Sequence, residues 1–166
     1  MSDGIRRGAK EGLGFGIAAG VIFAAMEVVG ATLMGDPPLM PFRMFASVLL
    51  GHPETIPMGT ALIVGSLAHL ALSAVFGLVY GAVNGRLSDE TQTSWGRQAV
   101  GGLVYGTLLW FVNFQVIARA VYPWFLMSPQ FLQAMMHAVF FGLPLGLMYA
   151  GAERRIHHGH PTPSPA

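Results

Sequence analysis

The chain is poor in charge and has no cysteine. Of its 166 residues only 10% are charged, whereas soluble domains carry about 25% charged residues. Without cysteine the chain can form neither a disulfide nor a thiolate metal site. The shortage of charge, together with a net charge of +1, excludes an ordinary soluble enzyme, a nucleic-acid-binding protein and a disordered chain.

The sequence also lacks the motifs of the common enzyme classes. It contains no G-x-S-x-G, no phosphate-binding loop and no pair of carboxylates placed for acid–base catalysis. We therefore assign no catalytic residue. Whether the chain is an enzyme stays open, and a non-enzymatic role is favoured.

Apolar sequence, in contrast, is abundant, at 53% of all residues. A membrane-crossing helix needs about 20 mostly apolar residues, and four stretches qualify: 12–34, 58–84, 98–118 and 131–152. We predict an all-α integral membrane protein, a four-transmembrane-helix bundle in the lipid bilayer.

The segments outside these spans are short. Residues 41–50 are apolar but too few to span, which predicts a short interfacial or re-entrant helix in the first outer loop. Residues 1–11 are interpreted as a cytoplasmic flank and residues 153–166 as a disordered, proline-rich cytoplasmic tail.

Basic residues predict how the spans are oriented. Two basic residues, Arg43 and Arg119, flank the spans on one side, and seven flank them on the other: Arg6, Arg7, Lys10, Arg86, Arg97, Arg154 and Arg155. Lys and Arg concentrate in cytoplasmic flanks. Both termini are therefore predicted to be cytoplasmic.

A five-residue pattern that begins with glycine and has an aromatic residue in the fourth place, first at 12–16, recurs once in each span. Small residues four apart form faces on which helix backbones approach closely. The glycines expected to pack helices are Gly12, Gly16, Gly20, Gly77, Gly81, Gly85, Gly102, Gly106, Gly142 and Gly146. The recurrence suggests a two-hairpin internal repeat. Because these glycines gather towards the cytoplasmic ends, we expect the bundle to widen towards the extracytoplasmic face.

Three ionisable residues, Glu27, His69 and His137, lie inside the predicted spans. Each is eleven or twelve residues from the aromatic residue of its own span's glycine pattern. At about 1.5 Å per residue, all three share one layer, about 17–18 Å from that aromatic level. Ionisable residues at such a depth are functional candidates.

Three further polar residues accompany this layer. Asn113 and Gln115 lie on the third span. Arg43, in the first outer loop, points either to lipid headgroups or inward to Glu27. Tyr122, Trp124 and Phe125 in the second outer loop form either an interfacial aromatic belt or the roof of an outer cavity.

Several functions fit the polar layer. Glu27, His69 and His137 could bind a metal ion, carry protons or ions, or bind a small ligand. His69 and His137 could ligate a haem b in an electron carrier. Alternatively, the cluster only specifies helix packing, and the chain is an accessory subunit of a homo-oligomer or of a larger membrane complex.

The order of these features resembles the YagU-like family of small bacterial inner-membrane proteins. The matching features are Ala18-Ala19-Gly20-Val21 in the first span, Pro37-Pro38 followed by Arg43, His69, Trp95-Gly96 and His137. The resemblance implies four spans in the bacterial cytoplasmic membrane. It implies no activity, because none is established for that family.

Overall fold

The computed structural model describes residues 3–158, and within that range the chain is helical, with no strand. The elements are α1 (Asp3–Leu33), α2 (Met40–Leu50), η1 (Pro53–Thr55), α3 (Met58–Thr60), η2 (Ala61–Gly65), α4 (Ser66–Asn84), α5 (Asp89–Thr93), α6 (Trp95–Trp110), η3 (Phe111–Ala118), α7 (Arg119–Val121), η4 (Pro123–Met127), α8 (Gln130–Met135), η5 (Met136–Gly142) and α9 (Leu143–His158).

These elements join into four long rods. The rods are Gly4–Leu33, Met58–Asn84, Trp95–Val121 and Gln130–Ile156, and each is long and apolar enough to cross a membrane. Between 17% and 39% of the most apolar window of each rod is buried inside the protein. Most of their apolar surface therefore faces outward, as expected of a multi-pass membrane protein. The prediction of four such helices is confirmed.

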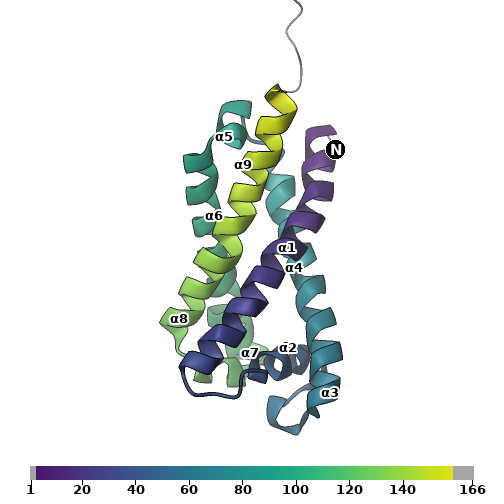
Figure 1. The fold of residues 1–166 in the computed structure, drawn as a ribbon, viewed down its shortest axis with the longest axis vertical. Coiled ribbons are helices and arrows are strands. Elements are labelled where there is room, and N and C mark those ends of the chain that lie inside the picture. Colours follow the sequence, from purple (N-terminus) through teal and green to yellow (C-terminus); the bar gives the residue numbers. More distant parts are fainter. Residues whose placement is uncertain (1–2, 159–166) are drawn as a thin grey trace, which may run out of the picture.

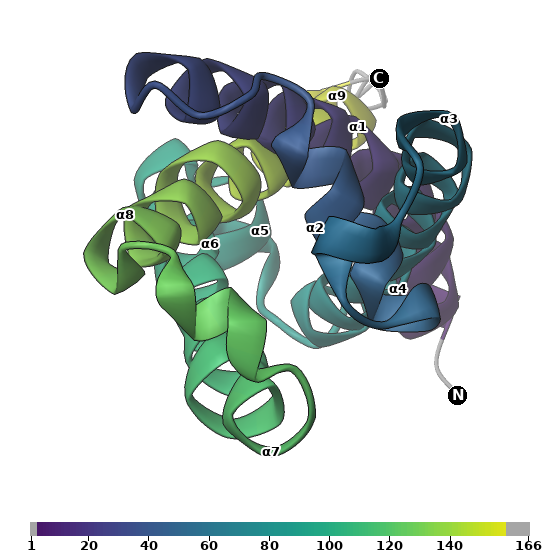
Figure 2. The ribbon, with the colours of Figure 1, turned by 90° about the horizontal axis from the view of Figure 1, so that it is seen from below.

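The first rod starts and the last rod finishes at the same end of the molecule, which we call the terminal end (Figure 1). The short helix α5 lies there as well. The opposite end, called the loop end, carries α2, α3 and α7. Figure 2 looks onto the loop end. There α2 and α3 lie on the same side as α4, whereas α7 and α8 lie on the opposite side.

Glycines bring the rods into backbone contact in two pairs. A Cβ atom added to Gly12 of α1 would overlap the backbone of Gly77 of α4, and one added to Gly8 would overlap Gly81. Between α6 and the last rod, a Cβ on Gly102 would likewise overlap the carbonyl oxygen of Gly142. The absence of side chains therefore sets how closely each pair packs.

Three of the rods contain π-helical turns. The segments η2, η3 and η5 interrupt the second, third and fourth rods, and all three lie in the half nearer the loop end. A π-turn inserts an extra residue into the helical repeat, which rotates the following side chains around the axis. Such turns often occur at functional sites.

The short outer helix is present as α2, between Met40 and Leu50. Proline stands in its first turn, where the missing N–H costs nothing. The helix ends at Gly51, whose φ of +83° suits glycine alone. It packs against the second rod through Gly65, where an added Cβ would overlap the carbonyl oxygen of Phe42.

The ends of the first and last rods differ from the expectation. α1 begins at Asp3 rather than near residue 12, and α9 continues to His158 rather than stopping at residue 152. Residues 153–158, expected to be a disordered tail, are therefore helical; residues 159–166 lie outside the described range. An ion pair between Arg7 and Glu153 joins the two helical extensions.

Candidate functional site

A cavity of about 340 Å³ lies in the loop half of the molecule. Its walls come from all four rods, and α2 and η4 contribute residues at the loop end. The volume is within the range of small-molecule sites, about 300–1,000 Å³. The cavity lies in the half where the sequence predicted that the bundle widens.

Four of the six predicted ligand-binding residues line this cavity: Glu27, His69, Asn113 and His137. The other two do not. Gln115 instead accepts hydrogen bonds from Arg119 and donates one to Gln130 (3.2 Å). Arg43 forms no ion pair with Glu27, so the inward pairing considered for it does not occur in the described structure.

His69 is held by a backbone carbonyl group and by two aromatic rings. Its Nε2 atom donates a hydrogen bond to the carbonyl oxygen of Gly20 (2.8 Å). Its ring stacks on Phe45 (centroids 4.2 Å apart) and on Phe23 (5.6 Å). Because a neutral imidazole carries one N–H group, Nδ1 remains as a hydrogen-bond acceptor.

His137 is fixed in a similar way within the π-helical segment η5. Its Nδ1 atom donates to the carbonyl oxygen of Gln133 (2.8 Å). The ring meets Phe23 edge-on, with centroids 4.8 Å apart, and also contacts Phe114 (5.5 Å). Nε2 is left as the acceptor. Phe23 therefore touches both imidazoles, which places His69 and His137 around the same part of the cavity.

Glu27 is the single carboxyl group in the cavity wall. One oxygen, Oε2, accepts a long hydrogen bond from Nε2 of Gln133 (3.4 Å). The other oxygen, Oε1, is buried and has no hydrogen-bond partner among the residues that the structure describes. A buried polar atom without a partner costs about 1–3 kcal/mol. A ligand that donates to Oε1 would remove this cost.

The metal-site interpretation finds no support in the geometry. Over residues 3–158, no group of three or more His, Asp or Glu side chains is arranged to hold a metal ion. Glu27, His69 and His137 thus border one cavity without converging on one point. Both imidazoles contact the ring of Phe23, and ligation of a haem by His69 and His137 stays a prediction.

Aromatic residues of the second outer loop close the loop end of the cavity. Tyr122 and Phe125 line it. Nε1 of Trp124 donates to Oγ of Ser47 in α2 (2.8 Å), and the hydroxyl of Tyr122 donates to the carbonyl oxygen of Val48 (3.2 Å). These two hydrogen bonds hold η4 and the residue before it against α2. Tyr122 and Phe125 therefore contribute to a roof of the cavity, while the aromatic-belt interpretation of this loop stays a prediction.

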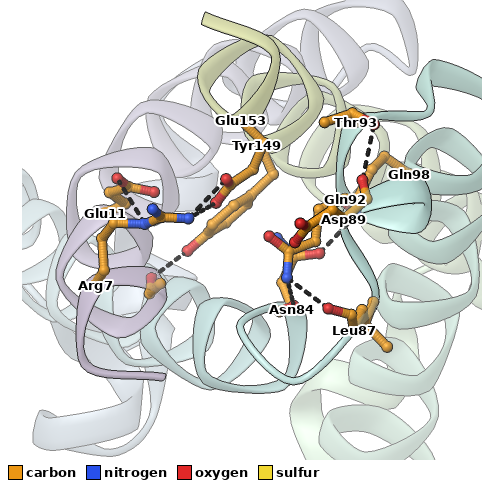
Figure 3. Close-up of polar contacts among 11 residues, drawn as sticks. Arg7, Glu11, Asn84, Leu87, Asp89, Gln92, Thr93, Gln98, Tyr149 and Glu153 are labelled. Atoms are coloured by element: carbon orange, nitrogen blue, oxygen red, sulfur yellow. Dashed lines mark hydrogen bonds and ion pairs between the residues drawn. The ribbon is translucent and has the colours of Figure 1, made fainter. Parts of the chain in front are cut away.

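Sequence reasoning missed a second polar region, at the terminal end. Arg7 donates to both carboxylate oxygens of Glu153 (2.8 and 2.7 Å), whose side chain is 2% exposed. Beside this pair, the Tyr149 hydroxyl donates to the carbonyl oxygen of Gly8 (2.6 Å). Figure 3 shows these contacts joining α1 to α9. Arg7 was interpreted only as an orientation signal.

Amide side chains extend this region under α5. Gln98 donates to Oδ1 of Asn84 (2.6 Å) and accepts from the hydroxyl of Tyr80 (2.8 Å). Gln92 donates to the carbonyl oxygens of Asn84 and Leu87 (Figure 3). Polar residues at the ends of apolar spans were the only signal in the sequence. That signal also fits residues facing the membrane surface.

Comparison with known proteins adds no assignment. No family model matches the chain, and no curated protein or solved structure matches it either. The resemblance to the YagU-like family therefore stays a prediction, and the functional argument depends on the cavity itself.

Proposed function

We propose that the chain is a four-span protein of the bacterial cytoplasmic membrane. It binds a small amphipathic molecule in the cavity that lies in the half nearer the loop end. Both termini would lie in the cytoplasm. The ligand would enter from the extracytoplasmic side, past α2 and η4.

The distribution of basic residues supports this orientation. Arg7 and Arg154 lie at the terminal end, where α4 ends two residues before Arg86 and where α6, which contains Arg97, begins. Arg43 and Arg119 are at the loop end. Because Lys and Arg are enriched on the cytoplasmic side, the loop end and its cavity would face outward.

The observation that carries the proposal is the chemistry of the cavity wall. The wall is mostly apolar, and its polar groups include Glu27, His69, Asn113 and His137. Ligand sites typically combine apolar walls with a few placed polar groups that orient the ligand. The unpartnered Oε1 of Glu27 provides one such group.

Because the chain has no cysteine, a single introduced cysteine reports accessibility without background. In intact cells, we expect a small membrane-impermeant thiol reagent to label Asn113→Cys in the cavity. We expect labelling to slow when 4-phenylbutylamine, 4-phenyl-1-butanol or 4-phenylbutyrate is present. These three probes share an apolar body and differ in their polar group.

Two matched variants control this experiment. Leu67→Cys, at an outward-facing side chain that is 66% exposed, should stay unlabelled because lipid covers it. Thr93→Cys, at the terminal end, should be labelled only in inverted vesicles. Labelling of Asn113→Cys from the cytoplasmic side alone would refute the orientation, and failure of all three probes to slow labelling would refute ligand binding.

A further inference from the structure

Several hydrogen-bond acceptors of the cavity wall are free to meet a ligand. Backbone carbonyl groups take the N–H of both imidazoles, so His69 and His137 each keep an acceptor nitrogen. Glu27 adds carboxylate oxygens. One N–H of Gln133 and the hydroxyl of Tyr122 are already donated to Glu27 and to Val48, whereas the amide of Asn113 can donate as well as accept. The wall therefore offers acceptors to a ligand that donates hydrogen bonds.

The formal charge of the wall has one sign. Glu27 is an acid, and no Lys or Arg is among the described residues that line the cavity. A carboxyl group in an apolar region either keeps its proton or meets a positive charge, because a lone buried carboxylate is very costly. A cationic ligand would meet both the charge and the unpartnered Oε1 atom.

The apolar wall suits a cation as well. Phe23, Phe45 and Phe114 surround the two imidazoles, and Phe76 and Phe141 continue the aromatic lining. Faces of aromatic rings attract ammonium groups, and this attraction grows when water is excluded. An alkyl or aryl body would contact the same rings through dispersion and the hydrophobic effect.

From these three observations, which rest on the proposed function because they concern the same cavity, we propose that the ligand is a lipophilic amine. Its protonated amino group donates to Oε1 of Glu27. Its apolar body lies among the phenyl rings. A carboxylic acid would meet Glu27 as a like charge, and an alcohol would bring one donor and no charge.

The test compares the three phenylbutyl probes on the same protein. The full chain is placed in phosphatidylcholine nanodiscs, and binding is measured by equilibrium dialysis, with empty nanodiscs subtracting partition into lipid. We expect 4-phenylbutylamine to bind at least about tenfold more tightly than 4-phenyl-1-butanol, because a hydrogen bond to a charged group is stronger than a neutral one. We expect 4-phenylbutyrate to bind most weakly.

A variant pair then locates the amino group. Glu27→Gln should weaken binding of the amine by about tenfold and leave binding of the alcohol unchanged. Glu54→Gln is the matched control, because Glu54 is an exposed acid near the same end that does not line the cavity. It should leave all three affinities unchanged. The comparison of probes on the unaltered chain holds even if Glu27→Gln fails to fold.

The outcomes separate the two proposals. If the alcohol or the carboxylate binds as tightly as the amine, or if Glu27→Gln binds the amine as Glu54→Gln does, the amine proposal is overturned while ligand binding stands. If none of the three probes binds above the empty nanodiscs, the proposed function fails, and the amine proposal fails with it.

Discussion

Gly12 and Gly14 are two residues apart on α1, yet they have opposite surroundings. A Cβ on Gly12 would overlap the carbonyl oxygen of Gly77, whereas one on Gly14 would have nothing within 4 Å. Both lie in the same pentapeptide of the sequence. The pattern identifies a glycine-rich stretch, and the packing decides which of its glycines must remain without a side chain.

This contrast gives a prediction with an internal control. Gly12→Ala should lower the free energy of unfolding by about 1–3 kcal/mol, because overpacking forces the two backbones apart. Gly14→Ala should lower nothing and gain up to about 1 kcal/mol from helix propensity. Both are measured by denaturant titration in one detergent. Equal losses for the two variants would contradict the role of this close approach.

The polar layer shows how far residue-level reasoning reaches. Counting along helices placed Glu27, His69 and His137 at one depth, and all three border one cavity. Gln115 is a candidate for its polarity alone, and it does not line the cavity. It is two residues after Asn113, which is about 200° around a helix of about 3.6 residues per turn. Asn113 does line the cavity.

At the scale of elements, the loop end is closed by two short segments that no span requires. The 3₁₀ segment η4 contacts α2 through the hydrogen bonds of Trp124 and Tyr122. The sequence predicted α2 from its apolar run and its bounding proline and glycine. It could not predict the partner of α2, because Ser47 and Trp124 are 77 residues apart.

The contact between η4 and α2 can be weakened at one atom. Trp124→Phe removes the donor to Oγ of Ser47 and keeps an aromatic ring. We expect a loss of about 0.5–1.5 kcal/mol in local stability, seen as faster hydrogen exchange across α2 and unchanged exchange in α5. Trp95→Phe, at a side chain that is 49% exposed, serves as the matched control. Exchange in α2 that is the same in both variants would count against the fastening role.

At the scale of the whole molecule, the two ends differ in kind. The terminal end is joined by ionic and amide hydrogen bonds between distant parts of the chain (Figure 3). The loop half holds the cavity and its aromatic walls. Hydropathy predicted the number of spans, since the apolar runs are long. It could not predict this difference, because a polar residue at the end of a span gives the same sequence pattern whether it faces water or another helix.

The terminal end also carries a prediction for global stability. Arg7→Ala should lower the free energy of unfolding by about 1–3 kcal/mol, because the 2%-exposed Glu153 loses both of its hydrogen bonds from the guanidinium group. Arg6→Ala removes the same charge from the neighbouring exposed residue and should change stability by less than about 0.5 kcal/mol. Thermal unfolding in one detergent compares them. A loss of similar size in Arg6→Ala would point to net charge rather than to the ion pair.

The glycine contacts between α1 and α4 also bear on alignment. Gly4, Gly8, Gly12 and Gly16 repeat every four residues, and Gly77, Gly81 and Gly85 do the same on α4. Sliding one helix by four residues, about 6 Å at the α-helical rise, would again set glycine against glycine. The repeat alone therefore leaves the register ambiguous. The hydrogen bond from His69 to the carbonyl oxygen of Gly20 identifies the register that forms, so a cavity residue also marks how far the two helices have slid.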